Sequence, residues 1–146
     1  MTILRRLLAR RTDWPPLAEA VVWLGLAWLA LRWMPFRRLV LLLRPPLPAR
    51  RTPADEREIS RVVWAVEAAA RRVPWRAVCF HEGIAVQRML SRRAIGADLH
   101  YGVVRGADGA LPAHVWVTVG GRVVVGGEES LGHTVLATFS PVVTGR

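Results

Sequence analysis

Hydrophobic positions follow two different periods along the chain. Up to residue 92 they recur at helical spacing, which predicts helices over residues 1–13, 17–33, 52–72 and 79–92, with a further short apolar stretch at 36–43. Beyond residue 98 apolar and polar residues alternate, which predicts strands over residues 98–104, 114–119, 122–125 and 135–139. Helices followed by an antiparallel sheet indicate an α+β fold.

Prolines divide the N-terminal half of this pattern. Trp14-Pro15-Pro16 separates a short basic amphipathic segment from the helix that follows, because proline is tolerated in a first helical turn. Thr52 and Pro53 likewise predict a cap and a first helical residue. The segment RPPLPARRTP, with its four prolines, predicts a stiff connector. We therefore expect an N-terminal helical extension over residues 1–48 and a second domain over residues 49–146.

The predicted helix over residues 17–33 is apolar on nearly every side. A core of about 100 residues does not easily cover such a helix all round, so part of its surface is expected to meet another protein or a membrane surface. The alternative, in which the second domain covers it completely, stays open. Its uncharged run ends at Arg32 and is too short to span a bilayer, which favours a buried or interfacial helix.

Composition excludes several classes of protein. At 52% hydrophobic residues the chain is not disordered by composition, and its single cysteine excludes an internal disulfide and a cysteine-rich zinc site. A lone thiol suits a reducing compartment, and the N-terminus lacks a signal-peptide cleavage site, so we expect a cytoplasmic protein. Histidines and carboxylates do not follow metal-ligand spacing, and we predict neither a metal nor a cofactor.

The charge balance points to an anionic partner. All 21 basic residues are arginine, and they outnumber 11 acidic residues to give a net charge of +10. Nucleic acid, anionic lipid and acidic peptides would each be attracted by this excess, which is equally explained by an arginine-rich composition without functional meaning. No nucleic-acid motif or stacking platform is present, so a nucleic-acid partner is not expected.

Cys79 and His114 are the candidate catalytic residues. Cys79 begins a predicted helix, where unpaired backbone N–H groups and the positive end of the helix dipole favour a thiolate and can bind an oxyanion. His114 begins a predicted strand. A thiol and an imidazole placed in this way are what nucleophilic cysteine catalysis requires. The ordinary alternative for a lone cysteine is a small residue of the core.

A glycine turn at residues 120–121 predicts which carboxylate could orient the histidine. In a two-residue hairpin of this register, His114 lies opposite Gly127. Alternation then places Glu129 on the same face as His114, which makes it the candidate third member. Glu128 stays open as the alternate, because a bulge in the glycine pair before it would reverse the alternation.

The remaining histidines have ordinary interpretations. His81 and His100 are expected to be hydrogen-bonded or exposed, and His133 to lie in a loop. Trp116 shares the face of His114, and we expect it to pack against the site or the core rather than to bind a cofactor.

The segments CFHEGIAVQRML, GADLHYGVVR, LPAHVWVTVGGRVVVGG and TVLATF resemble the transglutaminase-like cysteine protease superfamily. More narrowly, they are similar to the leader peptidases of lasso-peptide biosynthesis, over roughly residues 55–140. The resemblance implies a papain-like core in which Cys79 attacks a peptide carbonyl and His114 acts as base and then as acid. The family usually has an aspartate near the end of the second hairpin strand, where this chain has Glu128 and Glu129.

The resemblance also implies partners. It suggests thiol-protease removal of the leader from a ribosomally synthesised precursor peptide, presented by a small separate leader-recognition protein, with an ATP-dependent cyclase acting afterwards. The apolar N-terminal helices would suit docking to the recognition protein. Two other functions stay open: acyl transfer to an amine through the same thioester chemistry, and a catalytically inactive peptide-binding or docking protein.

Overall fold

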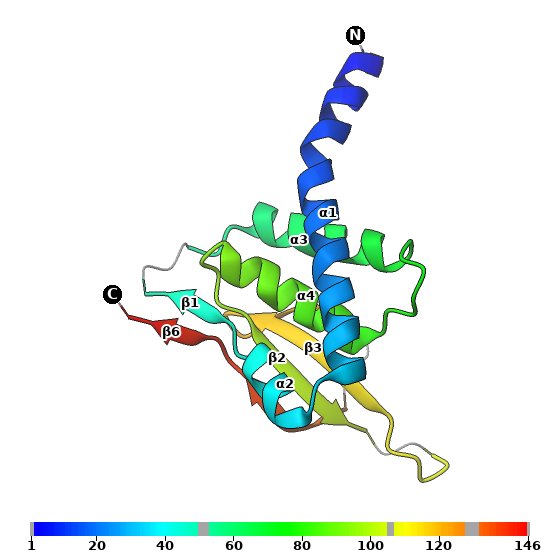
Figure 1. The fold of residues 1–146 in the computed structure, drawn as a ribbon, viewed down its shortest axis with the longest axis vertical. Coiled ribbons are helices and arrows are strands. Elements are labelled where there is room, and N and C mark those ends of the chain that lie inside the picture. The colour runs from blue at the N-terminus through cyan, green and yellow to red at the C-terminus, as the bar shows by residue number, and fades with distance from the viewer. Residues whose placement is uncertain (1, 50–52, 105–106, 128–131, 146) are drawn as a thin grey trace.

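The computed structural model describes residues 2–49, 53–104, 107–127 and 132–145, with side chains from residue 13 onward (Figure 1). Within these residues, four helices and a four-stranded antiparallel sheet give the α+β fold that the hydrophobic pattern predicts. In chain order the elements are α1 (Thr2–Trp33), α2 (Phe36–Leu42), β1 (Pro46–Pro48), α3 (Glu56–Ala70), α4 (Cys79–Arg92), β2 (Asp98–Val103), β3 (Ala113–Val119), β4 (Arg122–Val125), β5 (Thr134–Phe139) and β6 (Val142–Thr144).

The main sheet has the strand order β4-β3-β2-β5, and α4 packs on one of its faces. The closest approach is at Gly83, where an added Cβ would lie 2.8 Å from a methyl group of Val115 and 3.3 Å from one of Leu99. A glycine is therefore required if α4 is to lie this close to β3 and β2. This contact sets the height of the whole helix above the sheet.

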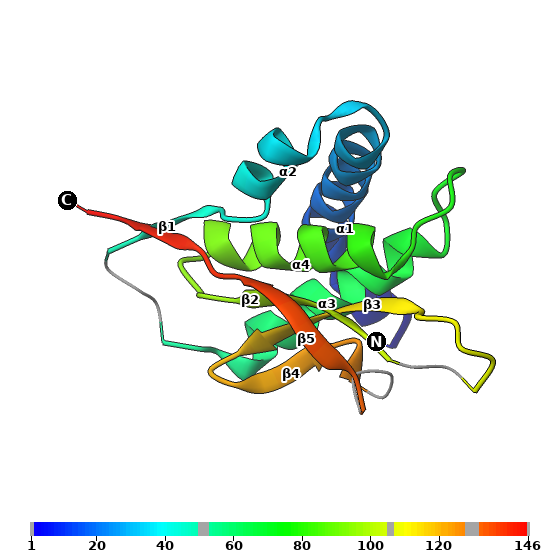
Figure 2. The same cartoon turned by 90° about the horizontal axis from the view of Figure 1, so that it is seen from below.

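Two helices form a further layer over α4 (Figure 2). Figure 2 shows α1 and α2 on the side of α4 that faces away from the strands. Leu24 of α1, Val66 of α3 and Ile84 of α4 are almost completely buried and belong to the same hydrophobic cluster as Val117 of β3. One continuous core thus connects the N-terminal helix to the sheet.

The first helix is longer than the sequence predicts. Instead of a break at Trp14-Pro15-Pro16, α1 runs without interruption from Thr2 to Trp33 and carries both prolines inside it. Proline has a helical φ, and Pro16 is buried together with Ala20 against the body of the protein. Tertiary packing thereby compensates for the backbone hydrogen bonds that the prolines remove.

The expected division at residue 48 does not correspond to two packing units. The helix α1 packs against α3 and α4, and the proline-rich segment forms β1, which pairs in parallel with β6 near the C-terminus. Neither short strand is predicted by the sequence, because prolines interrupt β1 and β6 has only three residues. The segment expected to act as a connector is instead fastened to the end of the chain.

The third helix begins later than Thr52 and Pro53 suggest. It starts at Glu56, and its cap is Asp55, whose carboxylate accepts a hydrogen bond of 3.0 Å from the backbone N–H of Arg57. An aspartate is as good a cap as a threonine, and it is followed by acidic residues that suit the first turn. Pro53 lies in the extended approach to the helix.

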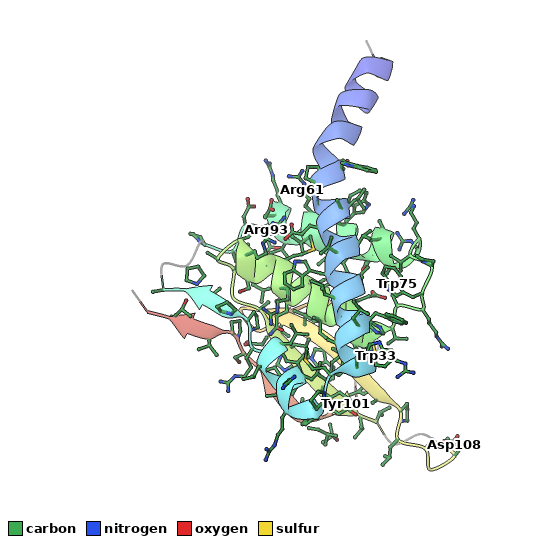
Figure 3. All side chains as sticks on the ribbon, viewed as in Figure 1. Trp33, Arg61, Trp75, Arg93, Tyr101 and Asp108 are labelled. Atoms are coloured by element: carbon green, nitrogen blue, oxygen red, sulfur yellow. The ribbon has the colours of Figure 1, made fainter. Side chains whose placement is uncertain are left out.

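Arg93 joins three helices through ionic hydrogen bonds. Its guanidinium donates to Glu58 of α3 at 2.6 Å, to Glu19 of α1 at 2.8 Å and to the carbonyl oxygen of Met89 in α4 at 2.8 Å. The side chain is only 24% exposed, and Figure 3 shows it at the junction of the three helices. Such partly buried charged bonds are stronger than those on an open surface.

We expect Arg93→Met to lower the free energy of unfolding by about 2 kcal/mol, because two half-buried carboxylates lose their charged donor. Urea denaturation followed by circular dichroism measures this. The matched control is Arg92→Met, since Arg92 is 66% exposed and 3.6 Å from Glu19; it should cost less than about 0.5 kcal/mol. Equal effects of the two substitutions would contradict the role given to Arg93.

Candidate active site

A cavity of about 580 Å³ opens at the first turn of α4, beside β3 and the residues that follow β4. Both Cys79 and His114 line it. The two residues come from different layers of the fold, one from the helix and one from the sheet. The structure thus brings the two sequence-predicted catalytic residues to a single site.

Cys79 is the first residue of α4, as the sequence predicts. Val78 precedes it in an extended conformation, and the thiol is partly exposed at the cavity. The first N–H groups of a helix have no partners within the helix, so the positive end of α4 lies beside the sulfur. Backbone N–H groups at such a position can bind an oxyanion that forms beside the sulfur.

His81 holds the turn on which Cys79 sits. Its Nδ1 accepts a 3.0 Å hydrogen bond from the backbone N–H of Val78, and its side chain is buried. Burial lowers the pKa of His81 below its ordinary value of 6.5, and an unprotonated Nδ1 is what this bond requires. The prediction that His81 is hydrogen-bonded is confirmed, and its role is to cap the helix.

His114 is buried on β3 and held on several sides. Its Nε2–H donates to the carbonyl oxygen of Gly126 at 3.2 Å, and its ring stacks on Trp116 with centroids 6.2 Å apart. A carbonyl oxygen can only accept, so this bond requires a hydrogen on Nε2. Trp116 packs against the site, as predicted.

His114 and α4 belong to opposite faces of the sheet. Val115 and Val117 point towards Gly83 of α4, so His114 and Trp116, which alternate with them, belong to the other face. His114 nevertheless lines the same cavity as Cys79, at the point where the pairing of β4 ends at Val125 and Gly126 lies beside β3. The site is therefore built at a strand edge.

Gly126 makes this edge possible. Its φ of 73° is in the region that favours glycine, and an added Cβ would lie 3.0 Å from Nε2 of His114 and 2.9 Å from the carbonyl oxygen of Val115. A larger residue would push the imidazole away. The glycine pair is visible in the sequence, but its contact with His114 is not.

The register of the β3–β4 hairpin differs from the one expected. Val119 pairs with Arg122 as predicted, but Val117 pairs with Val125, one residue later than a regular hairpin gives. The alternation used to prefer Glu129 over Glu128 therefore does not hold. Both glutamates lie outside the described residues, so a third catalytic member at either position stays a prediction.

The cavity also contains charged residues that the sequence did not indicate. Glu82 of α4, Glu67 of α3 and Arg76 line it together with Cys79. Burial raises the pKa of Glu82, repulsion from Glu67 adds to this, and Arg71 opposes it. Glu82 could have been found, because it lies three residues after Cys79 on the same helix, whereas nothing in the sequence indicates that Glu67 would join it.

The other histidines lie near the site without lining the cavity wall described above. His100 bridges Thr118 and Thr138 through its two ring nitrogens, at 2.8 and 2.9 Å. His133 is a loop residue, as expected, but its ring lies 5.3 Å from that of His114, a contact with no sequence signal. Within the described residues, no three His, Cys, Asp or Glu side chains come together in a way that could hold a metal ion.

Comparison with known families identifies the fold. Residues 20–142 match the transglutaminase-like superfamily, and the chain therefore belongs to that superfamily, which includes cysteine peptidases and acyltransferases. Neither the curated proteins nor the solved structures gave a match. The match begins inside α1, which agrees with the packing of that helix into the common core.

We expect the stability of the fold to fall as the pH drops below 6.5, partly through His81. Because burial lowers its pKa in the folded state, the unfolded chain binds the proton first, so this stabilisation is complete above pH 6.5 and is lost towards the lower folded pKa. Urea denaturation over a pH series measures the slope of the free energy of unfolding against pH. His81→Gln should reduce it while keeping an acceptor for Val78, whereas His81→Ala should also destabilise at neutral pH by about 1 kcal/mol. An unchanged slope in His81→Gln would contradict this assignment.

Proposed function

We propose that this protein is a cysteine peptidase that removes the leader from a ribosomally synthesised lasso-peptide precursor. The observation that carries the proposal is the shared cavity of Cys79, at the N-terminus of α4, and His114, on β3 beside the end of β4. Membership of a superfamily that includes cysteine peptidases supports the chemistry. The resemblance of the segments around both residues to lasso leader peptidases supports the substrate.

In the proposed mechanism, Nδ1 of His114 accepts the thiol proton of Cys79, and the sulfur attacks the scissile carbonyl carbon. The oxyanion that forms is stabilised by the N–H groups of the first turn of α4. His114 then gives the proton to the departing amine, which leaves a thioester on Cys79. Water attacks the thioester with His114 as base, and the leader carboxylate and the free thiol are released.

The Nε2 side of the imidazole determines its orientation during these steps. The carbonyl oxygen of Gly126 accepts the Nε2 hydrogen, and the ring stacks on Trp116. A glutamate at position 128 or 129 would add a negative charge that stabilises the imidazolium. The proposal therefore has a Cys-His pair held by backbone and aromatic contacts, completed by one of two adjacent acids.

The precursor is proposed to arrive with a small leader-recognition protein in the cytoplasm, and an ATP-dependent cyclase would use the product. Acyl transfer to an amine is the second candidate, because the superfamily includes acyltransferases that share the thioester step. Mass spectrometry of the products distinguishes the two, since hydrolysis adds one water across a peptide bond and transfer forms a new amide.

Cys79→Ala is expected to lower the cleavage rate by about 10³-fold or more, because the nucleophile is removed. The assay uses a lasso-peptide precursor and a leader-recognition protein, with products followed by mass spectrometry. His114→Ala should behave in the same way, whereas His100→Gln, a change at a histidine that bridges two threonines across the sheet, should keep most of the activity. Cleavage that persists in a folded Cys79→Ala protein would refute the proposal, and inactivity of the unchanged protein would favour a docking function.

Comparison of Glu128→Gln with Glu129→Gln tests the third member, each variant being the control for the other. Substitution of the glutamate that orients His114 should lower kcat by about 10²-fold or more, because a neutral amide no longer stabilises the imidazolium. Substitution of the other glutamate should leave kcat close to that of the unchanged enzyme. Steady-state kinetics over a pH series measures this. If neither variant loses activity, the site works as a pair without an acid at these positions.

A further inference from the structure

The outer layer of the molecule, formed by α1 and α2, exposes a continuous apolar face. On α1, Val22, Leu26, Leu29 and Trp33 recur at helical spacing, with exposures from 45% for Leu26 to 72% for Trp33. Phe36, at the start of α2, is 71% exposed as well. Because large side chains on a soluble surface are usually scattered, a stripe of this length indicates a surface that is covered by something else.

A groove of about 380 Å³ lies where the two helices meet, and it belongs to the same face. Leu26, Leu29 and Trp33 of the stripe line it together with Met34. Among the described residues that form its wall, Arg38 is the one that carries a charge. The groove thus offers an apolar recess with a cation at its margin.

The charges around this face have one sign. From Ala20 to Ala54 the sequence contains six arginines and no acidic residue. Arg32, Arg37, Arg38 and Arg44 of this set are exposed, and the guanidinium of Arg32 lies 4.7 Å from the centre of the Trp33 ring. An apolar stripe bordered by arginines and containing a tryptophan is the composition of a helix that lies in the interface of an anionic bilayer.

We propose that the α1–α2 face binds the surface of an anionic phospholipid bilayer, with α1 lying in the plane of the membrane. Trp33 and Phe36 would enter the headgroup boundary with the leucines of the stripe, while the arginines reach the phosphates. This inference does not depend on the proposed peptidase activity. It would hold the protein at the membrane, with the sheet facing the cytoplasm (Figure 2).

The structure favours binding on the surface rather than across the bilayer. Contrary to the expectation from its uncharged run, the segment Asp13–Trp33 is long and apolar enough to cross a membrane, with a mean hydropathy of 1.4. Its other side, however, is packed into the protein, since Ala20, Leu24 and Ala27 are fully buried. Glu19 is paired with Arg93 of the body. A spanning helix would have to leave these contacts.

Vesicle co-sedimentation of the full chain tests the proposal. Binding is expected to mixed phosphatidylcholine and phosphatidylglycerol vesicles, to be much weaker with pure phosphatidylcholine, and to be released by high salt, because arginine–phosphate attraction is screened. Arg37→Gln with Arg38→Gln should weaken partitioning by about 30-fold. Leu26→Gln with Leu29→Gln should weaken it by about 10-fold or more.

Matched controls separate this face from general charge and hydrophobicity. Arg57→Gln with Arg72→Gln removes the same charge from exposed positions of the α3 region, and Leu136→Gln removes a leucine that is 59% exposed on β5. Both controls should bind vesicles like the unchanged protein. Peptide cleavage in solution should be the same for all these variants. A failure of the peptidase proposal would therefore appear in the cleavage assay and not in vesicle binding.

Four outcomes would overturn the proposal. The first is equal binding to vesicles with and without phosphatidylglycerol, and the second is an equal loss of vesicle binding in the face and control variants. The third is bound protein that resists both high salt and alkaline extraction, which would indicate a spanning helix. The fourth is no vesicle binding together with protection of Leu26 and Trp33 by the leader-recognition protein in hydroxyl-radical footprinting, which would assign the face to a protein partner.

Discussion

The close packing of α4 on the sheet is the constraint on which the rest of the structure depends. Gly83 lets the helix approach until the position of a Cβ would be 2.8 Å from Val115. This contact sets where the first turn of α4, with Cys79, stands relative to β3. The helices α1 and α3 then pack on the sides of α4 that remain, and Arg93 binds all three together. A shift of α4 would therefore move Cys79 and the outer layer at once.

The site itself depends on an interruption of the sheet. A regular hairpin would continue β4 alongside the whole of β3 and cover the edge at His114. Instead, the shifted register and the left-handed Gly126 end β4 at Val125, and the histidine bonds to the backbone at that point. Irregular strands are common next to active sites because they turn a side chain towards a place that a regular strand does not reach. Here the irregularity gives a residue of the far face access to the cavity of Cys79.

The arrangement separates two tasks between the two sides of the molecule. The reactive cavity lies among α4, β3 and the end of β4, with Glu67 and Glu82 in its wall. The outer face of α1 and α2 carries exposed apolar side chains and arginines. The proposed peptide chemistry and the proposed membrane attachment would thus occupy different surfaces, connected through the shared hydrophobic core. Substitutions on one surface can be examined without direct contact with the other.

The sequence by itself determined the α+β class, the strands β2 to β5 and the start of α4 at Cys79, because these depend on local periodicity, glycine turns and helix ends. It also identified Cys79 and His114 from their residue types and local structure. Only the tertiary structure decided that α1 continues through two prolines, that β1 pairs with β6, and that Val124 shifts the hairpin register. The physical reason is that these features depend on contacts between residues far apart in the chain, which outweigh local preference. For the same reason, Glu67 and His133 near the site could not be found by reading along the sequence.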